Sequence, residues 1–146
     1  MYKRQADIVL GTDWDVTLVL ADTTRQVRVT DAWLERLLRN GGRAGDFIFR
    51  ISQFYRDFYR STGVTDGFYN HDPTAMVYLV DPSLFATEKR AIRVVTDGIS
   101  IGDVIAAKSI HYQNPGPWYG VPLATITTTV DSVGVMKSIE DTLINR

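Results

Sequence analysis

A histidine beside a carboxylate is the feature of this sequence that points most directly to chemistry. His71 and Asp72 lie in the segment Gly67-Phe68-Tyr69-Asn70-His71-Asp72-Pro73, where the pattern predicts the start of a helix. A helix N-terminus carries a partial positive charge and free N–H groups. A carboxylate there suits a cation or a sugar hydroxyl, and a neighbouring histidine suits proton donation. The structural alternative is a routine helix cap followed by a first-turn proline, and the pattern alone favours that alternative.

The sequence contains few of the residue types that bind transition metals. The chain has no cysteine and two histidines, which excludes disulfides, thiolate nucleophiles and multi-histidine metal sites. His111 has no partner nearby in the sequence, and we assign it no role. A bound metal would therefore be a hard cation such as calcium or magnesium, held by carboxylates and carbonyls. Asp13, Asp15 and Asp22 bracket a predicted strand, but no complete calcium loop accompanies them, and isolated surface acids are the simpler interpretation.

Arginine is concentrated in residues 25–60. Eight arginines lie there: Arg25, Arg28, Arg36, Arg39, Arg43, Arg50, Arg56 and Arg60. Interleaved with aromatic residues, they could form a surface for phosphates or stacked bases. Carboxylates in the same region dilute this charge, and the formal net charge of the chain is −1. Two solvated helix faces explain the pattern more simply, and we expect no nucleic-acid partner.

The elements that must position these residues alternate between strands and helices. Residues 16–21 form an apolar run that predicts a strand buried on both faces, followed by a polar turn at residues 22–24. Thr30 can cap a helix that ends at Gly41-Gly42. A third helix runs from Asp72, read as its cap, to about Val80.

Between these lies a helix over Phe47–Tyr59 whose apolar positions share one face: Phe47, Ile51, Phe54, Tyr55 and Phe58. In the last third, residues 91–96 and 121–130 predict strands, and in the second of these the odd-numbered positions 121–129 would share a face. An amphipathic helix closes the chain, with these side chains facing inward: Val133, Met136, Ile139, Leu143 and Ile144.

Length and composition fit a soluble α/β protein. The 146 residues are 45% hydrophobic and 23% charged, which predicts one domain over residues 1–146. No apolar run approaches the roughly 20 residues of a membrane span, and the N-terminal residues lack the apolar stretch of a signal peptide. We therefore expect a cytoplasmic protein with no membrane partner.

Several segments, in the right order, resemble the C-terminal part of the inosine–uridine-preferring nucleoside hydrolases. The turn Asp22-Thr23-Thr24-Arg25 is similar to the family's Asp-x-Thr-His turn, with Arg25 where a histidine is common. Phe54-Tyr55-Arg56-Asp57-Phe58-Tyr59 is similar to its aromatic helix. The most specific segment is His71-Asp72-Pro73 with the following Asp81-Pro82-Ser83-Leu84-Phe85. The resemblance implies the C-terminal half of a nucleoside-hydrolase-like open sheet with flanking helices.

The resemblance also implies an activity, namely cleavage of the N-glycosidic bond of ribonucleosides. By carry-over, His71 would be the catalytic acid for the leaving base, and Asp72 would bind the substrate's ribose hydroxyls and calcium. The family's Asp-rich N-terminal motif, which supplies most calcium ligands and the general base, has no counterpart here. One carboxylate binds calcium weakly, so we expect weak or absent calcium binding and little activity from this chain alone.

The missing half has a consequence for assembly. Half of an open sheet exposes an edge strand and apolar surface, so we expect a homo-oligomer or pairing with a missing N-terminal half. The alternative is a non-catalytic module that binds a nucleoside or a protein through the aromatic surface of Phe47–Tyr59.

Overall fold

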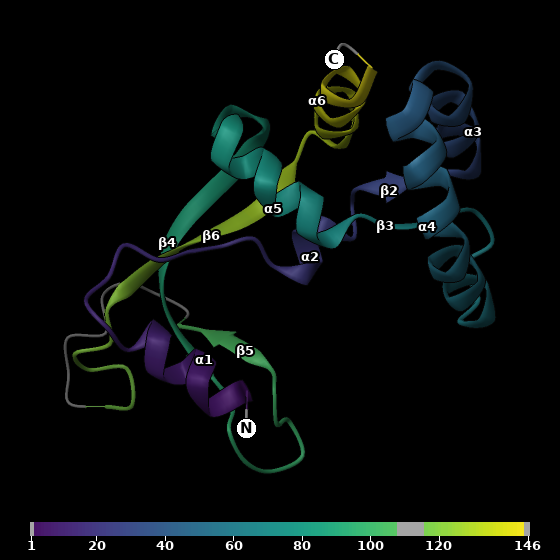
Figure 1. The fold of residues 1–146 in the computed structure, drawn as a ribbon. Helices are drawn as coiled ribbons and strands as arrows, with labels where there is room; N and C mark the ends of the chain where they lie inside the picture. Colours follow the sequence, from purple (N-terminus) through teal and green to yellow (C-terminus); the bar gives the residue numbers. More distant parts are fainter. Residues whose placement is uncertain (1, 108–115, 145–146) are drawn as a thin grey trace. The chain divides into compact units, whose positions relative to one another are not determined.

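The computed structural model describes residues 2–107 and 116–144 of the chain, and His111 lies outside them (Figure 1). Contacts group the chain into two compact units. The first unit comprises Met1–Leu18 and Thr87–Thr127, and the second comprises Val19–Ala86 and Thr128–Arg146. The sequence prediction of one domain over residues 1–146 stays a prediction. Within the described residues, no helix combines the length and the apolar character needed to cross a membrane.

The first unit is built on a sheet. Its elements are α1 (Tyr2–Leu10), β1 (Thr17–Leu18), β5 (Val104–Ala106) and most of β4 (Phe85–Val94) and β6 (Leu123–Val130). The sheet order is β1-β6-β4-β5. Strand β1 pairs parallel with β6, and β5 pairs antiparallel with β4. Because one pairing is parallel and another antiparallel, the sheet is mixed, and with its helices the chain has the predicted α/β fold class. Strands β4 and β6 each continue into the second unit.

Helix α1 is attached to β4 by one carboxylate. Asp7 accepts hydrogen bonds from Arg93 Nε at 2.8 Å and Nη2 at 2.7 Å, and from the backbone N–H of Val94 at 2.9 Å. The hydrogen bond from Arg93 is the main reason that the pKa of Asp7 lies below its ordinary value. A bidentate pair of this kind also fixes geometry, so the helix is held in register with the strand.

The second unit contains the remaining helices. They are α2 (Ala21–Thr24), α3 (Asp31–Asn40), α4 (Gly42–Ser61), α5 (His71–Val80), the 3₁₀ turn η1 (Pro82–Leu84) and α6 (Ser132–Ile144), with the short antiparallel pair β2 (Arg28–Val29) and β3 (Phe68–Tyr69). Thr30 caps α3, because its hydroxyl accepts a hydrogen bond from the N–H of Trp33 at 3.1 Å. This cap and the end of α3 at Asn40, before Gly41, confirm the sequence prediction.

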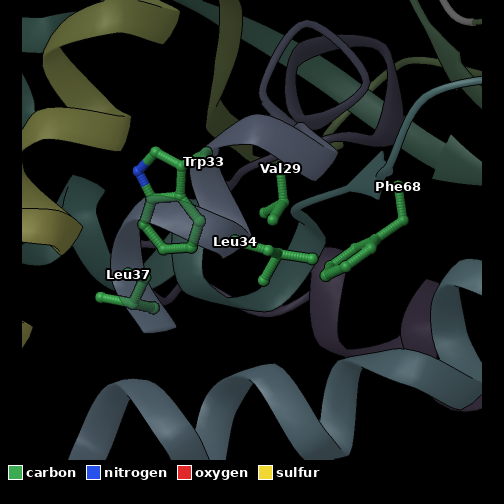
Figure 2. Packing of buried hydrophobic residues seen from close by; sticks show 5 residues of the cluster. All are labelled: Val29, Trp33, Leu34, Leu37 and Phe68. Carbon is green, nitrogen blue, oxygen red and sulfur yellow. The ribbon is translucent and has the colours of Figure 1, made fainter. Parts of the chain in front are cut away.

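One hydrophobic cluster joins α3 to the β2–β3 pair. Figure 2 shows Trp33, Leu34 and Leu37 of α3 packed with Val29 of β2 and Phe68 of β3. Leu34 and Leu37 are completely buried. Side chains from α4 and α6 cover the cluster, among them Ile48, Ile139 and Leu143. The cluster therefore positions β3, which leads directly into the segment that carries His71.

A second cluster corrects the expected inner face of α6. Val135 is completely buried against Val27, Val77 and Phe85, whereas Val133, expected to face inward, is 77% exposed. Met136 and Ile139 contact the clusters as predicted. The helix is rotated so that Val135 and Ile139, four residues apart, lie on the same inner face.

The strand predicted over residues 16–21 is wrong in length and burial. Only Thr17–Leu18 form a strand, both are at least partly exposed, and Ala21 already begins α2. The predicted polar turn at residues 22–24 is thus a helical turn. The expected face of β6 is also incorrect in part, because the buried residues include Ala124 and Ile126, while Leu123 is exposed.

Helix α4 is longer than predicted, and its apolar face is exposed to solvent. It spans Gly42–Ser61 rather than Phe47–Tyr59. The five apolar residues of its predicted face are all exposed, from Tyr55 at 42% to Phe54 at 79%. The buried positions of α4 are the small residues Gly45 and Ser52. Gly45 lies so near α3 that a Cβ atom would stand 2.1 Å from the carbonyl oxygen of Leu37.

Candidate functional site

A glycine allows the His71 segment to reach its position. Gly67 has a φ of +68°, and a Cβ atom there would lie 1.8 Å from the carbonyl oxygen of Val29. The absence of a side chain lets β3 pair with β2. The N–H of Asn70 then donates to the carbonyl of Val27 at 2.9 Å. Helix α5 begins at the next residue, His71, so Asn70 rather than Asp72 precedes the helix, and its side chain makes no capping bond.

Both ring nitrogens of His71 are hydrogen-bonded. Nδ1 lies 2.6 Å from the hydroxyl of Thr24, and Nε2 lies 3.1 Å from the hydroxyl of Tyr59. Thr24 is buried on α2, and Tyr59 is partly buried on α4. Three helices therefore hold one imidazole. Each partner is a hydroxyl that can donate or accept, so the arrangement allows either neutral tautomer.

Tyr59 is the more unusual of these partners. Burial is the main reason that the pKa of Tyr59 lies above its ordinary value, and the nearby Tyr55 adds to the effect. Tyr59 is therefore held in its protonated form over the physiological range. The rings of Tyr55 and Tyr59 pack edge to face with their centroids 5.3 Å apart, and the hydroxyl of Tyr59 is hydrogen-bonded to Nε2 of His71.

Asp72 lies in the first turn of α5 and is exposed. Together with His71 it lines a small open depression of about 190 Å³, whose other walls are Tyr55, Phe68, Tyr69, Asn70 and Pro73. Pockets for small molecules usually occupy about 300–1,000 Å³. The depression is therefore one wall of a site rather than a complete one.

The residues present do not fit a calcium site. Within residues 2–107 and 116–144, no three His, Asp or Glu side chains group in a way that could hold a metal ion. Asp13, Asp15 and Asp22, singled out in the sequence, are all exposed. Calcium takes about 6–8 oxygen ligands, and Asp72 offers one carboxylate. The same shortage of oxygen ligands is the basis of the prediction that this chain alone binds calcium weakly or not at all.

Many of the arginines of residues 25–60 are paired with carboxylates. Arg36, Arg39, Arg50, Arg56 and Arg60 all form ion pairs, and Arg28 lies over the ring of Tyr69 at 5.5 Å. Arg56 Nε and Arg60 Nη2 each lie 2.8 Å from Asp31. The two pairs with Asp31 tie α4 to α3, and the others lie on the helix surfaces, as the interpretation of two charged helix faces expects.

Sequence reasoning did not identify Thr24, Tyr55 or Tyr59 as site residues. Two signals were available. Tyr55 and Tyr59 stand four residues apart on one helix face, and Thr24 falls in a turn that resembles the family's Asp-x-Thr-His segment. Neither signal says which residue they contact, because that depends on how α2, α4 and α5 pack together.

Comparison with known proteins gives the family. The family model for the inosine-uridine preferring nucleoside hydrolases matches residues 5–137. The chain is 31% identical over 140 residues to uridine nucleosidase 1 of Arabidopsis thaliana, covering 95% of this chain and 42% of that protein. It is 30% identical over 113 residues to the inosine-uridine preferring nucleoside hydrolase of Crithidia fasciculata, covering 77% of this chain and 35% of that protein.

Solved structures of nucleoside hydrolases are similar in fold to this chain. A plant nucleoside hydrolase superposes with a TM-score of 0.91 at 33% identity, over 97% of this chain and 45% of that chain. A purine-preferring ribonucleoside hydrolase from Gardnerella vaginalis shares the fold, with a TM-score of 0.80 at 23% identity. The chain thus spans less than half the length of the relatives it matches. On the match over residues 5–137, this chain belongs to the inosine-uridine preferring nucleoside hydrolase family.

Proposed function

We propose that this chain supplies the leaving-group side of a ribonucleoside hydrolase site. In N-glycosidic hydrolysis, the bond between the ribose C1′ and the base nitrogen breaks, the base leaves with a proton, and water adds to C1′. His71 would provide the proton to the base, and Asp72 would bind ribose hydroxyls. Two of its relatives are a uridine nucleosidase and an inosine-uridine preferring nucleoside hydrolase, which supports ribonucleosides as the substrate class.

The observation that carries the proposal is the hydrogen bonding of His71. A histidine held at both nitrogens, with the hydroxyl of Tyr59 on Nε2, is fixed in one orientation, as a proton donor must be. A solvent-exposed histidine in a loop would show neither contact. Because both ring nitrogens are occupied, a proton from the imidazole would reach the substrate through the hydroxyl of Tyr59, or directly once that hydroxyl moves off Nε2.

The attack on C1′ needs a group that activates water, and the described part of the chain offers none beside Asp72. The described residues near Asp72 include no second carboxylate that could activate water. We therefore expect turnover only when further carboxylates come from elsewhere in the complete site.

The test is ribosidase activity of the 146-residue protein. Inosine and a chromogenic riboside would be assayed with calcium and with a chelator, beside His71→Ala. We expect turnover no higher than that of His71→Ala in both conditions. Calcium-dependent turnover that His71→Ala abolishes would show that the chain completes the site unaided, contrary to the proposed division of roles.

A second function has its own support. The exposed face of α4, with Phe47, Ile51, Phe54, Tyr55 and Phe58, fits a module that binds a nucleoside or a protein without catalysis. Phe54→Ala would then weaken nucleoside binding in calorimetry, whereas His71→Ala would not. Equal loss in both variants would assign the binding to the depression instead.

A further inference from the structure

We propose that the pocket between β2, α3 and α6 is a binding site for a small organic oxyanion, namely a carboxylate or a phosphate ester on an apolar body. The pocket is separate from the depression that contains His71, because no residue lines both. All of its lining residues belong to the second unit. The proposal therefore does not depend on the proposed function.

The pocket has room for a small molecule. It encloses about 460 Å³, and known small-molecule sites usually occupy about 300–1,000 Å³. Part of its wall is apolar, formed by the ring of Trp33 and by Val133, Met136 and Ile144. A ligand with an apolar body would cover these side chains, which favours binding.

A buried donor without an acceptor points to the ligand. Trp33 is 6% exposed, and its indole N–H has no hydrogen-bond partner among the residues that the structure describes. Figure 2 shows the indole nitrogen on the edge of the ring that faces away from Val29, Leu34 and Phe68. The N–H therefore points out of the hydrophobic cluster, and Trp33 lines the pocket together with residues of α6. An indole N–H can only donate, so its partner must be an acceptor.

The charged side chains of the pocket favour an anion. Arg28, Arg36 and Lys137 line it, against the carboxylates of Glu140 and Asp141. Lys137 is closely paired with Asp141 at 2.6 Å, but Arg36 Nη2 lies 3.5 Å from Glu140, longer than the roughly 2.7–2.9 Å of a strong charged pair. The half-exposed guanidinium of Arg36 can therefore turn to an incoming carboxylate or phosphate, which it can bind through two parallel N–H groups.

Two helices begin at the wall of the pocket. Thr30 caps α3 and Ser132 is the first residue of α6, and both line the pocket. A helix N-terminus carries a partial positive charge. Asp131 offsets this charge in part at α6, because its Oδ1 accepts a hydrogen bond from the N–H of Gly134 at 3.0 Å. The unpaired indole N–H, the guanidinium of Arg36 and the two helix starts thus favour the same ligand class, an oxyanion.

The test observes the indole N–H of Trp33 directly. The chain has three tryptophans, so the 146-residue protein carrying Trp14→Phe and Trp118→Phe shows one indole signal in a ¹H–¹⁵N spectrum. Phenyl phosphate, benzoate and benzyl alcohol would each be titrated into it. We expect a saturable downfield shift with at least one of the two oxyanions, with a dissociation constant of about 1 mM or tighter, and none with neutral benzyl alcohol. The oxyanion that binds more tightly identifies the ligand as a phosphate ester or a carboxylate.

Two arginines of α3 provide the matched comparison. Arg36 lines the pocket, whereas Arg39 does not and pairs with Glu35 at 3.8 Å. We expect at least about tenfold weaker binding with Arg36→Gln and unchanged binding with Arg39→Gln. Lys137→Gln should also weaken binding, because it leaves the negative charge of Asp141 without its partner. Circular dichroism checks that each variant is folded.

Three results would each overturn the proposal: no saturable shift with either oxyanion, the same shift with benzyl alcohol, or equal binding by Arg36→Gln and Arg39→Gln. The first result would mean that only water reaches the indole N–H. None of these measurements requires ribosidase activity, so the failure of the proposed function would leave the oxyanion site standing.

Discussion

His71 is held by residues that lie far from it in the sequence. Thr24 is 47 positions away and Tyr59 is 12 positions away. Sequence reasoning could identify the histidine and its neighbouring carboxylate, because both are adjacent and stand at a predicted helix start. It could not identify the two hydroxyls, because hydrogen bonds between helices follow from tertiary packing rather than from local pattern.

Removing the Tyr59 hydroxyl should change the environment of one ring nitrogen of His71, namely Nε2. In Tyr59→Phe, the ring still packs edge-on against Tyr55, Phe58 and Tyr69, but Nε2 of His71 loses its partner. We expect the free energy of unfolding to fall by about 1 kcal/mol and the ¹⁵Nε2 resonance of His71 to shift.

The measurement is a long-range ¹H–¹⁵N spectrum of the histidines, with the His71 signals assigned from His71→Ala. The matched control is Tyr69→Phe, whose ring lies 6.1 Å from the His71 ring. If Tyr69→Phe moved the ¹⁵Nε2 signal as much as Tyr59→Phe, the hydrogen bond to Tyr59 would not be the one that orients the imidazole.

A second residue-scale effect depends on pH. Burial disfavours the charged form of Asp31, but the ion pair with Arg56 and the hydrogen bond from Arg60 outweigh it and hold the pKa of Asp31 below its ordinary value of 3.8. Because the folded-state pKa is the lower one, the ionised pair stabilises the fold fully above pH 3.8. That stability is lost as pH falls from 3.8 through the folded-state pKa.

Urea unfolding at several pH values tests this linkage. Asp31→Asn should be less stable than the native chain at pH 7, and the difference should shrink as pH falls below 3.8. Glu35→Gln is the control, because Glu35 pairs with Arg39 at 3.8 Å on an exposed helix face and contributes little. A difference for Asp31→Asn that stays constant down to pH 2 would contradict the assignment.

At the scale of elements, the structure depends on close backbone approaches. Gly67 combines a φ of +68° with a carbonyl oxygen 1.8 Å from where a Cβ atom would stand, whereas Gly63 has a φ of +93° and open space around it. Gly63→Ala should therefore lose about 1 kcal/mol, from backbone strain alone. Gly67→Ala carries the same strain plus a clash with β2 and should lose at least about 2 kcal/mol more.

Urea denaturation midpoints of the two variants measure the difference. Because Gly67 precedes β3, Gly67→Ala should also displace the Tyr59–His71 contact, visible in the histidine spectrum. Equal losses in both variants would mean that β2 and β3 can separate at no cost.

Local signals predicted some elements well and others poorly. Helix α3 follows from Thr30 and Gly41, and α5 from Pro73 and the break at Asp81-Pro82, because caps and prolines act within a few residues. The fold class follows from the alternation of strands and helices. The burial of the 16–21 run and the inner face of α6 did not follow, because a side chain's exposure depends on distant segments. The apolar face of α4 was predictable as a face, and only the alternative of a binding module treated it as a surface.

At the scale of the whole molecule, the two units share strands. Strands β4 and β6 each contribute residues to both units. A strand that unfolds in one unit disturbs its own continuation in the other, so we expect a single cooperative transition, as the one-domain prediction requires.

Tryptophan fluorescence can test this prediction. A variant with Trp14→Phe and Trp118→Phe keeps only Trp33, which lies in the second unit and is buried. Its fluorescence transition in urea should coincide with the transition seen by circular dichroism for the whole chain. Two separated midpoints would show that the units unfold independently.

Because three helices hold the imidazole of His71, its hydrogen bonds should be lost on heating before the chain unfolds as a whole. The ring keeps its orientation only while α2, α4 and α5 are all in place, and α2 is a single turn of four residues. Local opening of the weakest of these helices releases Thr24 or Tyr59 before the rest of the chain melts. If His71 donates the proton as proposed, activity depends on the stability of one short helix. A completed enzyme would then lose activity at temperatures where most of its fold is still intact.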